Sequence, residues 1–282
     1  MPPVCIPLRW PHRRCAGESP VLKHQPRKRF GQNFLHDQKI IDRIIACIAP
    51  RPEDLLVEIG PGQAALTRPL LASGAELHII EIDRDLVTRL QNQFSDHANI
   101  TIHACDALKA NFQELTTGRP FRLIGNLPYN ISTPLIFHIL NYHQQVIDMH
   151  FMLQKEVVDR MAAVPGSRTY GRLSVMTQFR CKVTPLFDVL PESFTPVPRV
   201  CSSIVRLEPF ETAPANVGSI ERFERVVAAA FSQRRKTLRN SLGNLLSTEQ
   251  ILASGVEPGQ RAEQLSLSQF AALARSLPYD KD

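Results

Sequence analysis

The sequence lacks the patterns that mark several large classes of protein. No apolar run approaches the ~20 residues that a helix needs to cross a bilayer, and residues 1–20 have no continuous apolar region typical of a secretory signal. The 6 cysteines show no C-x-x-C spacing and no clustered histidine partners, so neither a metal site nor a disulfide framework is indicated. No internal repeat is visible. We expect a cytoplasmic protein with reduced thiols, no membrane segment and no metal.

Length and charge limit the classes of protein that remain possible. With 282 residues and a hydrophobic fraction of 43%, the chain has room for one full α/β domain and a smaller appendage. The net charge is +6, and residues 1–29 account for all of it, with seven basic side chains against Glu18. A second basic cluster contains Arg234, Arg235, Lys236 and Arg239. Two such clusters around a neutral body favour a polyanionic partner, although solvated surface charge is the alternative.

Residues 1–26 contain six prolines, little periodicity and a high cationic content. This composition predicts a disordered basic extension. Its arginines faintly suggest a transit peptide, but the prolines oppose the amphipathic helix that such a peptide needs. A wrongly assigned start site is the other interpretation.

From residue 27 onward, helical and strand patterns alternate. A helical pattern over about 40–48 is followed by strand patterns at 55–59, 77–82, 100–104, 121–124 and 147–153, with helical segments between them. Two late strands, 181–189 and 200–207, bracket a proline-rich loop. We therefore expect residues 27–209 to form a doubly wound, mainly parallel Rossmann-like α/β sheet with an antiparallel late-strand edge.

The composition changes near residues 209–217, and residues 210–282 show helical periodicity without a strand signal. They are predicted to form a small all-α domain. The second basic cluster would share one helix surface there, where it could contact phosphates without reading sequence.

A glycine-rich turn and a later acid indicate a nucleotide-type site. Gly60-Pro61-Gly62 follows a buried strand pattern and precedes a helical segment, and Glu81 comes 21 residues after Gly60. Glycines allow close approach of a ligand, and an acid at this offset can accept hydrogen bonds from ribose hydroxyls. The pattern indicates an adenosine-bearing cofactor without saying which. Asp106, just after the third strand, either meets an adenine amino group or caps the next helix.

The turn Asn126-Leu127-Pro128-Tyr129 ends the fourth strand, where ligands bind in open α/β sheets. The Asn126 carboxamide offers donors and an acceptor, Pro128 fixes the backbone, and the Tyr129 ring offers a face on which a base can stack. Phe194, beside prolines, is either a second wall for that base or a packing residue.

Several stretches together resemble the bacterial KsgA/RsmA ribosomal RNA adenine dimethyltransferases over about residues 27–277. They are Arg27 to Asp37 (RKRFGQNFLHD), Val57 to Thr67 (VEIGPGQAALT), Gly125 to Pro134 (GNLPYNISTP), Met149 to Glu156 (MHFMLQKE), Tyr170 to Val175 (YGRLSV), Phe194 to Pro198 (FTPVP) and Gln233 to Leu242 (QRRKTLRNSL). The resemblance implies a class I methyltransferase domain that binds S-adenosylmethionine and a small helical RNA-binding domain behind it. It also implies dimethylation at N6 of two adjacent adenosines near the 3′ end of small-subunit rRNA, within a pre-ribosomal 30S particle, by a monomeric enzyme.

The resemblance also assigns roles to residues. Asn33 and Leu35 would line the cofactor entrance, Gly60 and Gly62 the methionine end, Glu81 the ribose and Asp106 the adenine. Asn126 would lie between the cofactor and the substrate amine, with Tyr129 and Phe194 stacking on the target base.

Elementary chemistry agrees with such a site. The N6 lone pair of adenine is delocalised into the ring, so methyl transfer needs the amine turned and held in line. Hydrogen bonds from N6–H to the Asn126 side-chain oxygen and to the Leu127 carbonyl would achieve this without a strong base or a metal.

Three alternatives stay open on sequence grounds. An adenine methyltransferase acting on large-subunit rRNA would share the Asn-Leu-Pro-Tyr turn. An NAD-dependent oxidoreductase would share the glycine turn and Glu81. A catalytically silent RNA-binding assembly factor would keep the fold only as a scaffold.

Overall fold

A computed structural model describes residues 32–278 of the chain, so the extension predicted over residues 1–26 lies outside the described residues. The chain divides into two compact units. The first comprises the chain up to Lys155 together with Pro185–Glu208, and the second comprises Glu156–Thr184 and the chain from Pro209 onward.

The main sheet has seven strands in the order β4-β3-β2-β5-β6-β9-β7. The strands β2 to β6 pair in parallel, and β9 pairs antiparallel with β6. The predicted mainly parallel sheet with an antiparallel late-strand edge is thus confirmed. Their bounds are β2 Leu55–Ile59, β3 Glu76–Glu81, β4 Ile100–Ala104, β5 Phe121–Asn126, β6 Val146–Gln154, β7 Cys181–Val189 and β9 Ser202–Pro209. After β4 the chain crosses to the other side of β2, so the strand order reverses between β2 and β5.

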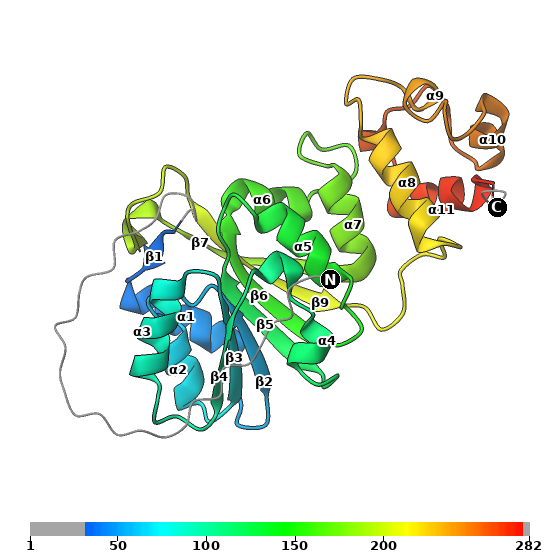
Figure 1. Ribbon diagram of the computed structural model, residues 1–282. Helices are drawn as coiled ribbons and strands as arrows, with labels where there is room; N and C mark the ends of the chain where they lie inside the picture. The colour runs from blue at the N-terminus through cyan, green and yellow to red at the C-terminus, as the bar shows by residue number, and fades with distance from the viewer. Residues whose placement is uncertain (1–31, 279–282) are drawn as a thin grey trace. The chain divides into compact units, whose positions relative to one another are not determined.

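Helices cover both faces of this sheet. Figure 1 shows α1 (Gln38–Ile48), α2 (Thr67–Ala72) and α3 (Arg84–Gln93) on one face, with α5 (Ser132–Leu140) on the other. Because both faces are covered, the central strands read as nearly continuous apolar runs, and every residue of β2 is buried. The helix α1 packs through Ile41, Ile44 and Ile48, which recur at helical spacing. A short helix, α4, spans Phe112–Leu115.

A second, two-stranded sheet was not predicted. It pairs β1 (Phe34–Leu35) antiparallel with β8 (Phe194–Thr195), so that Phe34 lies opposite Thr195 and Leu35 opposite Phe194. The pairing continues where the His36 N–H donates to the Ser193 carbonyl at 3.0 Å. This ribbon joins two segments about 160 residues apart in the chain.

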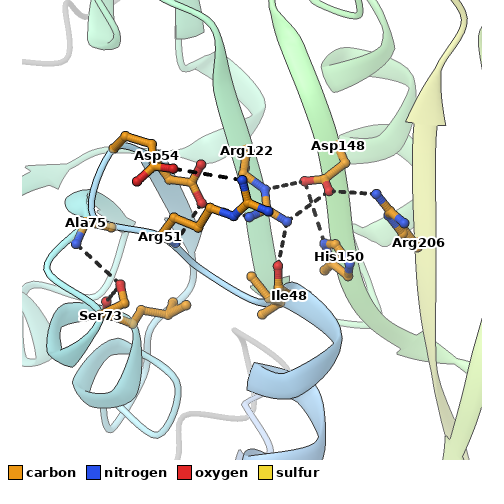
Figure 2. A network of polar contacts seen from close by, with 11 residues as sticks. Ile48, Arg51, Asp54, Ser73, Ala75, Arg122, Asp148, His150 and Arg206 are labelled. Atoms are coloured by element: carbon orange, nitrogen blue, oxygen red, sulfur yellow. Dashed lines mark hydrogen bonds and ion pairs between the residues drawn. The ribbon is translucent and has the colours of Figure 1, made fainter.

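A buried ion network lies near the amino ends of the parallel strands, the end opposite the predicted site (Figure 2). The Arg122 guanidinium, on β5, donates from Nε to Asp148 Oδ1 at 2.8 Å and from Nη2 to Asp148 Oδ2 at 3.0 Å. It also donates to Asp54 Oδ2 at 2.8 Å and to the Ile48 carbonyl at 2.7 Å. One side chain therefore joins β5 to β6, to the start of β2 and to the end of α1.

The second unit is helical, apart from the first residues of β7. Its helices are α6 (Lys155–Met161), α7 (Arg172–Arg180), α8 (Ile220–Ala230), α9 (Leu238–Ser241), α10 (Thr248–Ala253) and α11 (Leu267–Ser276). Aromatic contacts join its early and late parts: the ring centroids of Phe179 and Phe223 are 4.7 Å apart, and those of Tyr170 and Phe231 are 6.1 Å apart. These contacts explain why Glu156–Thr184 groups with the C-terminal helices, which differs from the single boundary expected near residue 209.

The basic cluster does not form one helix surface, so that prediction is wrong. The helix α8 ends at Ala230, three members lie in the following turn, and only Arg239 lies in a helix, α9. All four side chains are exposed. Arg234 differs from the others because it donates to the Arg168 carbonyl and its Nε lies 3.8 Å from Glu263 Oε2.

Within residues 32–278, no helix combines the length and the apolar character needed to cross a membrane.

Candidate functional site

A pocket of about 220 Å³ lies in the first unit, at the carboxyl ends of the parallel strands where the strand order reverses. This is where ligands bind in open α/β sheets. Ten of the residues predicted for the site line it: Asn33, Leu35, Gly60, Gly62, Glu81, Asp106, Asn126, Leu127, Pro128 and Tyr129. Phe194 does not. The fold therefore brings together segments that are up to 96 positions apart.

The glycine turn after β2 forms one wall. Gly62 has φ +56°, and a Cβ placed there would lie 3.0 Å from two carbons of the Phe34 ring. Glycine is needed at this position because the backbone has a positive φ and because the Phe34 ring leaves no room for a side chain. The expected helix does not begin directly after the glycines: residues 62–66 form turns, with Ala64 at φ +66°, and α2 begins at Thr67.

Gly125 brings the neighbouring strand end close to this turn. A Cβ at Gly125 would lie 2.7 Å from the Ile59 carbonyl oxygen, which no side chain tolerates. The small residue lets β5 and β2 approach where both reach the pocket. Asn126 follows directly as the last residue of β5.

Glu81 is nearly fully buried at the end of β3. Its Oε1 accepts the backbone N–H groups of Ile82 and Asp83, each at 2.9 Å. Burial raises the pKa of the carboxyl, although hydrogen bonds from these two N–H groups and from Gly62 act in the opposite direction. The carboxyl is thus held in place at the pocket wall as a hydrogen-bond acceptor.

Asp106 caps a short helix and lines the pocket as well. Its Oδ1 accepts the Leu108 N–H at 3.0 Å, at the start of a turn of 3₁₀ helix over Ala107–Lys109. The capping interpretation of this residue is therefore confirmed. Contact with an adenine amino group stays a prediction, which the residue's position in the pocket wall permits.

The direction of the Asn126 carboxamide is set by a backbone carbonyl just before β1. Its Nδ2 donates to the Asn33 backbone carbonyl at 2.9 Å. Since a carbonyl oxygen only accepts, the nitrogen of the carboxamide must face Asn33, and Oδ1 remains as the acceptor. The Leu127 N–H donates to the Met152 carbonyl at 3.1 Å, which ties the turn to β6.

Tyr129 is half-buried, and its hydroxyl lies 2.6 Å from Ser202 Oγ on β9. Burial raises the pKa of the phenol above its ordinary value, so the hydroxyl keeps its proton at neutral pH. Tyr129 is one of the residues that line the pocket.

Phe194 is fully buried, with a relative exposure of 0%, in the core cluster that also contains Phe34 and Leu35. In this arrangement it packs and presents no face to a base. A stacking role for Phe194 stays a prediction, and it requires the ring to leave this position.

Glu58 and Gln32 are among the pocket residues that sequence reasoning missed. Glu58, inside the buried run of β2, lines the pocket, and its Oε2 accepts a hydrogen bond from Thr67 Oγ1 at 2.7 Å. Burial raises the pKa of this carboxyl to about 7. Gln32 also lines the pocket and donates to Asp83 Oδ2 at 3.3 Å. An acid inside an otherwise apolar strand was the available signal for Glu58.

Within residues 32–278, Cys47, Cys181 and Cys201 are free. Within the described part of the chain, no group of three or more His, Cys, Asp or Glu side chains could hold a metal ion.

The donor set fits an adenosine-bearing sulfonium ligand. A backbone turn with a glycine at positive φ, acids at the ends of β2 and β3, and a carboxamide at the end of β5 all border one pocket. Buried carboxyls favour a ligand with hydroxyls and positive charge.

Comparison with known proteins agrees with this geometry. Residues 23–278 match the model of a family described as "Ribosomal RNA adenine dimethylase". The chain is 55% identical over 257 residues to "Ribosomal RNA small subunit methyltransferase A" of Pseudomonas syringae pv. tomato, covering 91% of this chain and 96% of that protein.

Two solved structures are similar over most of the chain. A dimethyladenosine transferase from Plasmodium falciparum has a TM-score of 0.73 at 26% identity and covers 85% of this chain and 95% of its own. The 23S rRNA methyltransferase ErmE has a TM-score of 0.67 at 28% identity and covers 87% of this chain and 99% of its own.

Proposed function

Since the chain belongs to the ribosomal RNA adenine dimethylase family, we propose that it methylates N6 of two adjacent adenosines near the 3′ end of small-subunit rRNA. The methyl donor is S-adenosylmethionine, and the product is N6,N6-dimethyladenosine, formed during small-subunit biogenesis. The relative that is 55% identical is named for the small subunit, which supports this choice of substrate.

The observation that carries the proposal is the direction of the Asn126 carboxamide. Its nitrogen is engaged by the Asn33 carbonyl, so its oxygen is the group that can accept a hydrogen bond from a substrate amine. The residue lies at the pocket wall shared with Glu81 and the glycine turn. An acceptor fixed in this way turns the N6 lone pair out of conjugation and aligns it, with little reorganisation during the reaction.

The remaining pocket residues bind and orient the donor. Glu81 accepts from the ribose hydroxyls, Asp106 from the adenine amino group, and the turn at Gly60 and Gly62 admits the methionine end. When bound, S-adenosylmethionine supplies a methyl group activated by its sulfonium charge. Asn33 and Leu35 border the entrance, and the Leu127 carbonyl is a second acceptor for the amine.

Tyr129 provides a ring on which the target base can stack. A base in structured RNA must leave its stack to be methylated, which costs a few kcal/mol, and stacking on an aromatic ring offsets about 1–3 kcal/mol. Phe194 adds a second ring only when it leaves the core position that it occupies in this structure.

RNA binding is assigned to the second unit. Arg235, Lys236 and Arg239 are exposed and can neutralise phosphates, with Arg234 as a partial contributor because of its contacts with Arg168 and Glu263. The methyltransferase domain then corresponds to the first unit and the RNA-binding domain to the second, in place of the boundaries 27–209 and 210–282 expected from the sequence. The partner is a pre-ribosomal 30S particle, and the enzyme acts as a cytoplasmic monomer.

Large-subunit rRNA is the second candidate substrate, because the ErmE structure is similar over 87% of this chain. The higher identity to the small-subunit relative favours the first candidate.

Transfer of tritiated methyl groups separates the candidates. The enzyme is supplied with labelled S-adenosylmethionine and, in parallel, with under-methylated small and large subunits, and the recovered nucleosides are analysed. We expect labelled N6,N6-dimethyladenosine from the small-subunit RNA alone. Label confined to large-subunit RNA would favour the second candidate, and no label in either would refute both.

A further inference from the structure

The Tyr129 hydroxyl is tied to a residue from a distant part of the chain. It lies 2.6 Å from Ser202 Oγ, within the normal range for an O–H···O hydrogen bond. Ser202 is fully buried at the start of β9, directly after the loop that follows Phe194. Its partner on β6 is Gln154, so its backbone position is set by the main sheet.

The backbone of Tyr129 is held separately from its ring. Ser132 Oγ donates to the Tyr129 carbonyl at 3.2 Å, and the Ile131 N–H donates to the Pro128 carbonyl at 3.2 Å. Pro128 restricts φ of the turn as well. These contacts act on the backbone, and the hydroxyl contact with Ser202 holds the far end of the ring.

We propose that Ser202 is a positioning residue that holds the Tyr129 ring at the angle required for stacking on the target adenine. The inference rests on the proposed function, in which Tyr129 contacts the base. Ser202 touches neither base nor donor in this scheme and acts only through the phenol.

The physical reason is preorganisation. A ring that swings about its χ torsions must be ordered when the base arrives, and that entropy is subtracted from the stacking energy. A ring already fixed by a buried hydroxyl avoids this loss. The antiparallel strand β9, which the nucleotide pocket does not use, thereby contributes to the base side of the site.

The test uses the full-length protein in three variants, Ser202→Ala, Tyr129→Phe and the double variant. Methyl transfer to under-methylated small subunits gives kcat and KM, and calorimetry gives the affinity for S-adenosylmethionine. We expect each single variant to lower kcat/KM for the small subunit about fivefold, the factor expected for one net hydrogen bond. The double variant should be no worse than either single variant, because both remove the same contact. Affinity for the donor should not change.

Ser203→Ala is the matched control. Ser203 is also buried, follows Ser202 on β9 and donates to the Phe187 carbonyl at 3.2 Å, so its loss removes a comparable hydrogen bond on the opposite face of the strand. It should leave kcat/KM unchanged.

Two results would overturn the inference. Wild-type kcat/KM in Tyr129→Phe, which differs by one oxygen and should fold, would show that the hydroxyl has no function. Losses that multiply in the double variant would show that Ser202 acts by another route. Tyr129→Ala tests the ring itself. If this variant is inactive while Tyr129→Phe and Ser202→Ala are fully active, the ring is needed for stacking but Ser202 does not position it. Full activity of Tyr129→Ala would refute both.

Discussion

Among single residues, Asn126 is the one whose surroundings bear most directly on chemistry. Its carboxamide is half-buried, faces the pocket and is oriented by one backbone carbonyl. An alanine at this position removes the acceptor without changing the backbone of the turn.

We expect Asn126→Ala to lower the rate of methyl transfer about 100- to 1,000-fold, the usual effect of deleting one preorganised polar group. RNA affinity should stay at the wild-type value. Single-turnover transfer and filter binding measure the two quantities. Asn99→Ala is the control, because Asn99 Nδ2 also donates to a backbone carbonyl, that of Ala75 at 2.8 Å, yet does not line the pocket. Unchanged turnover in Asn126→Ala would remove this residue from the mechanism.

Buried titratable residues make stability depend on pH in two opposing directions. Burial lowers the pKa of His150 and of His103 to about 4, and among residues 32–278 neither ring nitrogen of His150 finds a hydrogen-bond partner. The unfolded chain, with histidine near 6.5, binds more protons than the folded chain between pH 4 and 6.5, so stability falls as the pH falls through this window. Glu58 acts oppositely: with a folded pKa of about 7 and an ordinary value of 4.5, its contribution falls as the pH rises from 4.5 to 7.

We therefore expect His150→Leu to reduce the difference in unfolding free energy between pH 7 and pH 5 by about 2 kcal/mol, and Glu58→Gln to increase it by about 2 kcal/mol. Urea unfolding at both pH values measures the differences. His36→Gln, at an exposed position, serves as the control. An unaltered difference in His150→Leu would show that this histidine titrates alike in the folded and unfolded chains.

At the scale of elements, the strands were predictable where local patterns decide them. The run at 55–59 followed by two glycines gave β2 and its turn, because apolar periodicity and glycine placement are local signals. The ribbon of β1 and β8 was not predictable, since two residues pair with two others about 160 positions away. For the same reason the burial of Phe194 was not foreseen. The basic cluster was wrongly expected to lie on one helix surface because no glycine or proline follows Ala230 until Gly243.

At this scale we test Arg122, whose side chain links β5 to β6, to the residue before β2 and to the end of α1 (Figure 2). Arg122→Met leaves the buried Asp148 without its bidentate partner and should lower the free energy of unfolding by about 3–5 kcal/mol. Arg119→Met is the matched control. Arg119 lies 2.6 Å from Glu76 but its side chain is 50% exposed, so at most about 1 kcal/mol should be lost. Equal losses in guanidinium unfolding would show that the buried network contributes no more than a surface pair.

For the molecule as a whole, the catalytic and RNA-binding properties should separate by unit. The pocket belongs entirely to the first unit, and the basic cluster belongs to the second. Sequence patterns found both regions, but the boundary between units depends on aromatic contacts such as Phe179 with Phe223, which no local pattern encodes.

We expect the triple variant of Arg235, Lys236 and Arg239 to alanine to weaken RNA binding and to reduce the slope of log affinity against log salt by roughly 2 to 3. Donor affinity should stay unchanged. Titrations at several salt concentrations measure the slope. The control replaces Lys39, Arg51 and Lys109, which are exposed but scattered over the first unit. A wild-type slope in the cluster variant would place the phosphate contacts elsewhere. Arg234 is left unchanged because it contacts Arg168 and Glu263. Its replacement could weaken RNA binding by disturbing the fold rather than by removing a phosphate contact.

The hydrogen bond between Asn33 and Asn126 has a practical consequence for anyone handling the protein. The carboxamide that we propose to orient the reacting amine is itself held by the Asn33 carbonyl, near the beginning of the described chain. A protease cut just after Leu35 would remove the Asn33 carbonyl together with the buried side chains of Phe34 and Leu35. We therefore expect such a preparation to lose thermal stability as well as turnover.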